Sequence, residues 1–163
     1  YLDVLSSIKE CKIALKVLDK MNLPVLLGLH VKSNGKLPSN ESISEVFKKC
    51  KGENWLGIVA ACVSPEIVEL SIPILSKQKL PFGYKMNLFK NLPTSNKKSF
   101  NTEGFEGERE YEDPVELLGT RNKEYGIDKY TNFVSNSLDK GVTLIGGCCE
   151  IKPRHIEALK TLF

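Results

Sequence analysis

The sequence predicts an α/β fold built on a parallel sheet, and three observations lead to this prediction. Short apolar runs alternate with amphipathic segments along most of the 163 residues, which is the order of elements in parallel sheets with helical crossovers. The run at 25–31 does not alternate between polar and apolar residues, which is typical of a strand that is covered on both faces. With 41% hydrophobic and 26% charged residues, the composition is that of a folded domain.

Four predicted strands lie in the first half of the chain, at residues 1–5, 25–31, 56–61 and 80–85. Helices are predicted between them, where apolar residues recur at helical spacing, over residues 7–20, 42–50 and 66–77. The first helix shows the spacing clearly, because Ile8, Cys11 and Leu15 fall on one face. Ser64 and Pro65 suit the start of the third helix as cap and first helical residue.

The pattern is interrupted at residues 87–126, where we expect a long loop or insertion. Its acidic run at 103–110 suits a solvated loop, and a lid or a partner-binding insertion is the alternative. Regular structure returns with a helix over 130–140, a strand over 142–145 and a final helix over 153–163. About five βα units result, whereas a closed eight-unit barrel needs about 250 residues. The sheet is therefore either small and open or part of a barrel.

Charge and hydropathy argue against several classes of function. The formal net charge of +3 is small and scattered, which argues against a nucleic-acid-binding surface. No apolar run approaches the roughly 18 residues that span a bilayer, and the first residues are unlike a signal peptide. We therefore expect a soluble, cytoplasmic protein that does not bind membranes. The five cysteines are unevenly spaced and do not suggest a disulfide framework. Because a strand begins at once at Tyr1, we expect a fragment of a longer protein.

Three cysteines follow predicted strands. Cys62 comes directly after the third strand, and Cys148 and Cys149 follow the last strand, beyond Gly146 and Gly147, which we expect to break it. Ligands bind at the carboxyl ends of parallel strands, so we expect the three thiols on one functional face. Three thiolates with an open fourth position are typical of catalytic zinc. A thiol substrate bound there loses its proton and becomes a nucleophile, which suits alkyl transfer to sulfur.

Two other interpretations of the cysteines remain open. Free cysteines often pack as small apolar residues, and this is our expectation for Cys11 and Cys50, which lie on the apolar faces of predicted helices. The adjacent pair Cys148 and Cys149 is also compatible with a redox-active dithiol, in which case Cys62 plays no part.

The segment 146–150, followed by Pro153-Arg154-His155-Ile156, resembles the C-terminal signature of the homocysteine S-methyltransferase family. Residues 57–66 resemble the segment that supplies that family's first zinc-binding cysteine, and residues 2–10 resemble one of its barrel strands. The resemblance implies a (β/α)₈ TIM barrel, with residues 1–163 as the C-terminal portion of a single homocysteine-binding domain. The zinc ligands that it implies are Cys62, Cys148 and Cys149.

The resemblance also implies two substrate contacts. Asp3 stands where the family has a carboxylate, usually Glu, that meets the amine of homocysteine. Asn87 stands where a Pro-Asn pair is usual, and we expect it to contact the substrate. Two further departures lie near the expected site, because Ala61 replaces a frequent Asn and Glu150 replaces a frequent Gly.

We therefore expect a zinc-dependent methyltransferase of methionine biosynthesis, which moves a methyl group from a sulfonium or ammonium donor to the thiol of L-homocysteine. The attack needs no side-chain general base once the thiol is bound to Zn²⁺, so we assign no catalytic role to His30 or His155. The expected partners are homocysteine, a methyl donor and the N-terminal half of the barrel, and an oligomer is compatible with the sequence. The alternative is a catalytically inactive barrel fragment that acts as a structural or binding subunit.

Overall fold

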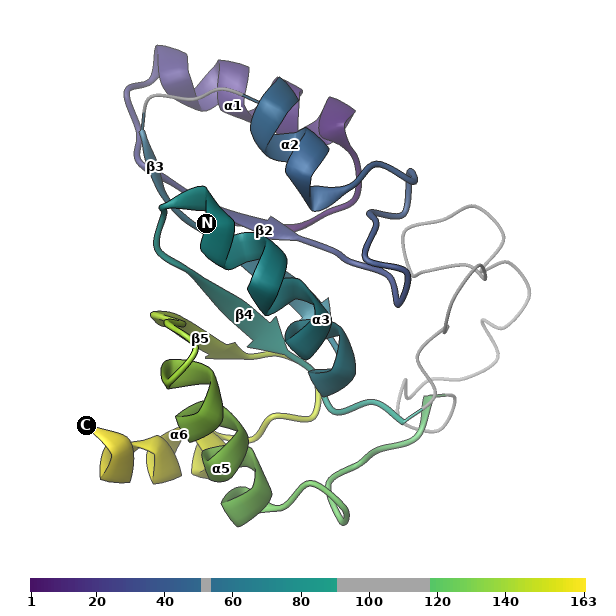
Figure 1. Cartoon of the computed structure of the whole chain (residues 1–163), viewed down its shortest axis with the longest axis vertical. Helices are drawn as coiled ribbons and strands as arrows, with labels where there is room; N and C mark the ends of the chain where they lie inside the picture. Colours follow the sequence, from purple (N-terminus) through teal and green to yellow (C-terminus); the bar gives the residue numbers. More distant parts are fainter. Residues whose placement is uncertain (51–53, 91–117) are drawn as a thin grey trace.

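The computed structural model describes residues 1–50, 54–90 and 118–163, and its centre is a sheet with the strand order β1-β2-β3-β4-β5 (Figure 1). The strands are β1 (Leu2–Leu5), β2 (Val25–Leu29), β3 (Trp55–Val63), β4 (Phe82–Met86) and β5 (Leu144–Gly147). The helices are α1 (Ile8–Lys20), α2 (Ile43–Lys49), α3 (Pro65–Leu75), α5 (Ile127–Leu138) and α6 (Pro153–Ala158), with 3₁₀ turns at Ser76–Gln78 and Leu159–Leu162. Every neighbouring pair of strands is parallel, which confirms the predicted α/β class.

Local sequence explains where the helices begin. At the start of α1, the Ser7 side chain accepts a hydrogen bond from the backbone N–H of Glu10. Ser42 and Glu45 form a reciprocal capping box at the start of α2. Pro65 occupies the first turn of α3, where a missing backbone N–H costs nothing. Ser64, which the sequence predicted as the cap of α3, is its N-cap residue but makes no side-chain capping hydrogen bond.

The two faces of the sheet are packed differently. One set of alternate strand positions, including Leu27, Ile58 and Tyr84, belongs to the hydrophobic core together with residues of the helices. The other positions form two rows across the opposite face, first Gly28, Val59, Gly83 and Leu144, then Ala61, Lys85 and Gly146. We call this opposite side the inner face. It is made largely of small and apolar residues, and Lys85 is the charged residue in these two rows.

Most element bounds differ from the sequence prediction by one to three residues, and three differences are larger in consequence. Strand β3 runs on to Val63, so Cys62 lies within the strand and not after it. Strand β5 includes Gly146 and Gly147, which we expected to break it, because both glycines still pair with β4. The last helix, predicted over 153–163, ends at Ala158 and continues as a 3₁₀ turn.

The segment predicted as a long loop has ordered ends. Phe89 and Thr120 form an antiparallel bridge, and the N–H of Arg121 donates to the carbonyl of Leu88 at 2.8 Å. The chain therefore leaves the sheet beyond β4 and returns beside the same place. Residues 91–117, with the acidic run at 103–110, lie outside the described residues.

The sheet has two edges, because β1 and β5 each have one neighbouring strand in the described part of the chain. Strands that follow one another in both sequence and space are typical of a singly wound barrel, whereas a doubly wound sheet reverses its order. The arrangement is consistent with half of a barrel. None of the described helices is long and apolar enough to cross a membrane.

Candidate metal centre

Three cysteine sulfurs meet at the carboxyl end of the sheet. The Sγ atoms of Cys62, Cys148 and Cys149 all lie within 4.8 Å of one another, and those of Cys148 and Cys149 are 3.7 Å apart. A tetrahedral zinc ion with Zn–S bonds of about 2.3 Å holds its sulfur ligands roughly 3.8 Å apart. The donor atoms and their spacing therefore fit a zinc ion with three protein ligands and one further position.

A bulge in β3 explains how Cys62 reaches this place. Its φ is +55°, and the register between β3 and β4 shifts so that Val63, and not Cys62, pairs with Met86. In a regular strand neighbouring side chains point to opposite faces, so Ala61 and Cys62 could not both serve the inner face. A bulge adds one residue and re-aims the side chain. The extra residue here is the metal-ligating candidate itself.

Backbone hydrogen bonds hold the cysteine pair against β4. The N–H of Cys148 donates to the carbonyl of Met86 at 2.7 Å, and the N–H of Leu88 donates to the carbonyl of Cys149 at 3.0 Å. A turn follows at once, in which the N–H of Ile151 donates to the carbonyl of Cys148 at 3.1 Å. Both sulfurs can thus approach Cys62, because the turn begins directly after β5.

Asn87 follows β4 and is fully buried beside Cys62. Its side-chain Nδ2 donates to the Cys62 sulfur at 3.7 Å, and its Oδ1 accepts from the N–H of Phe89 at 3.2 Å. Its own N–H donates to the carbonyl of Val63 at 2.9 Å. The substrate contact expected for Asn87 stays a prediction. In this structure its amide orients one of the three sulfurs.

Asp3 and Lys85 form an ion pair on the inner face, across the sheet from β1 to β4. The hydroxyl of Tyr1 donates to the second oxygen of Asp3 at 2.8 Å, and the Lys85 ammonium lies 5.7 Å from the centre of the Tyr1 ring. Burial lowers the pKa of Lys85, but the hydrogen bond to Asp3 and the negative charge of Cys148 outweigh it and raise that pKa. Asp3 therefore lies on the inner face beside Lys85, and its contact with the homocysteine amine stays a prediction.

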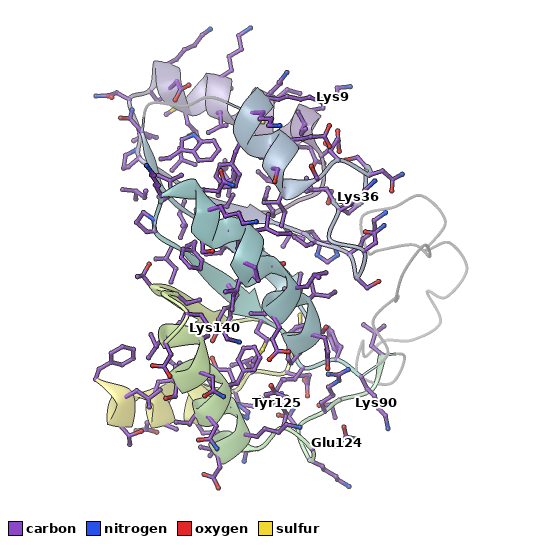
Figure 2. All side chains as sticks on the ribbon, in the orientation of Figure 1. Lys9, Lys36, Lys90, Glu124, Tyr125 and Lys140 are labelled. Carbon is purple, nitrogen blue, oxygen red and sulfur yellow. The ribbon has the colours of Figure 1, made fainter. Side chains whose placement is uncertain are left out.

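Lys85 was not among the residues predicted for the site. The sequence signal that could have identified it is a charged residue within a predicted buried strand, over residues 80–85. The lysines labelled in Figure 2, which are Lys9, Lys36, Lys90 and Lys140, are exposed and spread along the molecule. Lys85 differs from them because it lies within the sheet and beside the sulfurs.

The three sulfurs differ in acidity. A hydrogen bond from the Cys62 thiol lowers the pKa of Cys148 to about 6, although burial opposes this shift. The same hydrogen bond, together with burial, raises the pKa of Cys62, and burial with the charge of Cys148 raises that of Cys149. One thiolate is thus favoured at neutral pH. All three sulfurs can be thiolates together when a cation compensates their charge.

The remaining cysteines and histidines have structural contacts. Cys11 and Cys50 are buried in the hydrophobic core, as expected for packing residues. His30 is buried and its Nδ1 donates to the carbonyl of Ala61 at 3.2 Å, directly before the bulge. His155 is also buried, and its Nδ1 accepts from the N–H of Lys152 at 2.8 Å, which fixes the start of α6.

Glu150 stands directly after the cysteine pair, at the position where a glycine is frequent in the family that the sequence resembles. Its φ is +67°. Its carboxylate accepts hydrogen bonds from Asn122 at 2.6 Å and from Lys152 at 3.1 Å. A second link, the ion pair between Arg121 and Glu66, ties the same returning segment to α3. These contacts fasten residues 118–122 next to the three sulfurs.

Comparison with known protein families gives one match. The model of the homocysteine S-methyltransferase family matches residues 1–163 of the chain. No curated protein matches the sequence. The family match confirms the resemblance that the sequence motifs indicated.

Proposed function

Because the chain belongs to the homocysteine S-methyltransferase family, we propose that it transfers a methyl group to the thiol of L-homocysteine and yields methionine, with Zn²⁺ held by Cys62, Cys148 and Cys149. The observation that carries this proposal is the convergence of three sulfur atoms, all within 4.8 Å of one another, at the carboxyl end of a parallel sheet. This is the end at which barrel enzymes bind their substrates.

When bound, zinc supplies the positive charge that keeps a coordinated thiol deprotonated at neutral pH. The chain's own residues prepare the place for it. The bulge at Cys62 and the turn after β5 bring the three ligands together. The amide of Asn87 and the backbone bond from Cys148 to Met86 fix two of them before any ion binds, which reduces the ordering cost of binding.

The proposed reaction forms a bond between the homocysteine sulfur and the methyl carbon. It breaks the bond from that carbon to the sulfur or nitrogen of a sulfonium or ammonium donor, whose heteroatom keeps the electron pair. Three protein ligands leave the fourth zinc position for the homocysteine sulfur. Asp3 binds the amino group of homocysteine in this proposal, and its place on the inner face supports that role.

We further propose that other strands pair with β1 and β5 and complete a homocysteine-binding barrel, of which residues 1–163 form the C-terminal portion. The support is the parallel, sequential strand order and the two edges that it leaves. An unpaired strand edge offers free backbone hydrogen-bonding groups, and pairing with further strands in a closed barrel satisfies them.

Methionine formation tests the proposal. Full-length, zinc-loaded protein is incubated with L-homocysteine and, in separate reactions, S-methylmethionine, S-adenosylmethionine or betaine, and methionine is measured by mass spectrometry. We expect methionine with at least one donor, none after Cys148→Ser, and wild-type levels after Cys11→Ala, because Cys11 lies in the core. A folded, zinc-loaded protein that forms no methionine with any donor would contradict the proposal.

A further inference from the structure

Lys85 occupies a particular place relative to the three cysteines. In the register it pairs with Ala61 on one side and Gly146 on the other. Cys62 directly follows Ala61, and Cys148 lies two residues beyond Gly146. Lys85 therefore belongs to the row of inner-face residues that comes immediately before the sulfurs.

The path of the Lys85 side chain is set by small neighbours. A Cβ added to Gly146 would lie 3.6 Å from the Cγ of Lys85, so the stem of the lysine rests on the backbone of β5. Its ammonium reaches the carboxylate of Asp3 on β1, three strands away in the sheet. Along that path the sheet presents Ala61, Val59 and Gly28, of which none reaches far from the backbone.

Both charged groups remain partly accessible. The side chain of Lys85 is 24% exposed and that of Asp3 is 39% exposed, so a ligand can approach each of them. An ion pair with this accessibility contributes little to stability. Stability alone therefore does not explain why a lysine lies on a face that otherwise consists of small and apolar residues.

A homocysteine molecule carries a carboxylate and an ammonium on one carbon, and its side chain connects that carbon to the thiol. Asp3 and Lys85 offer the opposite charges next to each other, on the approach to the three sulfurs. We propose that Lys85 binds the α-carboxylate of homocysteine while Asp3 binds its α-ammonium, so that the pair opens to take up an amino acid as a zwitterion. This inference rests on the proposed function and assigns a specificity-determining residue within it.

The carboxylate contact of Lys85 should determine which thiols the protein binds. A thiol that lacks the carboxylate has no group for Lys85 to bind, so the lysine adds nothing to the affinity of the protein for that thiol. A thiol with both charged groups replaces one charge-assisted contact, between Lys85 and Asp3, by two, one to each residue. Lys85 therefore selects α-amino acids among thiols that can reach the metal.

Binding to the cobalt-loaded, full-length protein tests this assignment without relying on turnover. Cobalt(II) accepts the same ligands as zinc and changes its absorption when a thiolate binds. L-homocysteine is compared with 3-aminopropane-1-thiol, which has the same thiol and amine but no carboxylate. The variants are Lys85→Met, the conservative Lys85→Arg, and Lys49→Met as a matched control, because Lys49 also forms an ion pair but on the surface of α2.

We expect Lys85→Met to weaken homocysteine binding by about 10- to 100-fold, the usual effect of losing a hydrogen bond to a charged group. The affinity of Lys85→Met for 3-aminopropane-1-thiol should differ from that of the wild type by less than about twofold. Lys85→Arg keeps the positive charge and should retain most of the homocysteine affinity. Lys49→Met should bind both thiols like the wild type.

The outcomes separate the two proposals. If the wild type responds to homocysteine but Lys85→Met weakens both thiols equally, the carboxylate assignment is wrong and the proposed function stands. If the cobalt-loaded wild type shows no response to homocysteine, the proposed function itself fails, and this inference fails with it.

Discussion

The side-chain amide of Asn87 donates a hydrogen bond to the sulfur of Cys62 at 3.7 Å, from the end of one strand to the bulge of its neighbour. The amide is held in turn, because its oxygen accepts from the N–H of Phe89. Asn87 is also fully buried, so water does not compete for this contact. Partners of this kind orient metal ligands and are often as important as the ligands.

Replacing Asn87 by Ala should therefore weaken zinc binding by about 10- to 100-fold, the range found when such orienting partners are lost. The measurement is competition for zinc with a chromogenic chelator at fixed pH. Asn136→Ala is the matched control, because Asn136 is exposed on α5. Equal zinc affinity in the wild type and in Asn87→Ala would show that the amide does not support the ligand.

The acidity of Cys148 predicts its reactivity in the metal-free protein. Because its pKa is lowered to about 6, Cys148 should be mostly thiolate at pH 7 and should react with iodoacetamide before the other cysteines. Below about pH 6 the rate should fall roughly tenfold per pH unit, since the thiolate fraction falls. Burial raises the pKa of Cys11 to about 12, so Cys11 should stay unmodified.

Peptide mass spectrometry over a pH series measures this order of reaction, and added zinc should protect Cys148. Equal rates at Cys148 and Cys149 from pH 5 to 8, with no effect of zinc, would contradict the arrangement of the three sulfurs.

Strands β4 and β5 approach each other closely at Gly83, so a methyl group added there should destabilise the protein. A Cβ at Gly83 would collide with the backbone of Leu144, so Gly83→Ala should lower the free energy of unfolding by about 3 kcal/mol or more. Gly126→Ala is the control, because a Cβ there meets nothing within 4 Å and the φ of Gly126 is −67°. That change should shift stability by less than about 1 kcal/mol.

Urea unfolding of the two variants and the wild type measures both effects. A Gly83→Ala protein as stable as the wild type would mean that β5 does not pair with β4 as described.

The order of elements was predictable because it depends on patterns that short segments carry. Residues 25–31 and 56–61 are largely apolar, and Ile8, Cys11 and Leu15 recur at helical spacing, whatever the rest of the fold. These signals gave the α/β class and the five strands. The family motifs around Cys62, Cys148 and Cys149 then indicated the residues of the candidate site.

What the sequence could not show depends on register between distant strands. The bulge at Cys62 arises from its pairing with β4, and a strand considered alone would end before that residue or alternate through it. The ion pair between Asp3 and Lys85 joins residues 82 positions apart. No local sequence pattern predicts this ion pair. It depends on the number of strands between Asp3 and Lys85 and on the small residues of the sheet that the lysine side chain crosses.

The zinc content of the protein decides whether Cys62, Cys148 and Cys149 form a metal site. Full-length protein is purified under reducing conditions and its metal is measured by mass spectrometry, for the wild type, Cys148→Ser and the core control Cys11→Ala. We predict one zinc per chain in the wild type and in Cys11→Ala, and no zinc in Cys148→Ser. If the folded wild-type protein holds no zinc, even after incubation with the ion, the three cysteines do not form a zinc site.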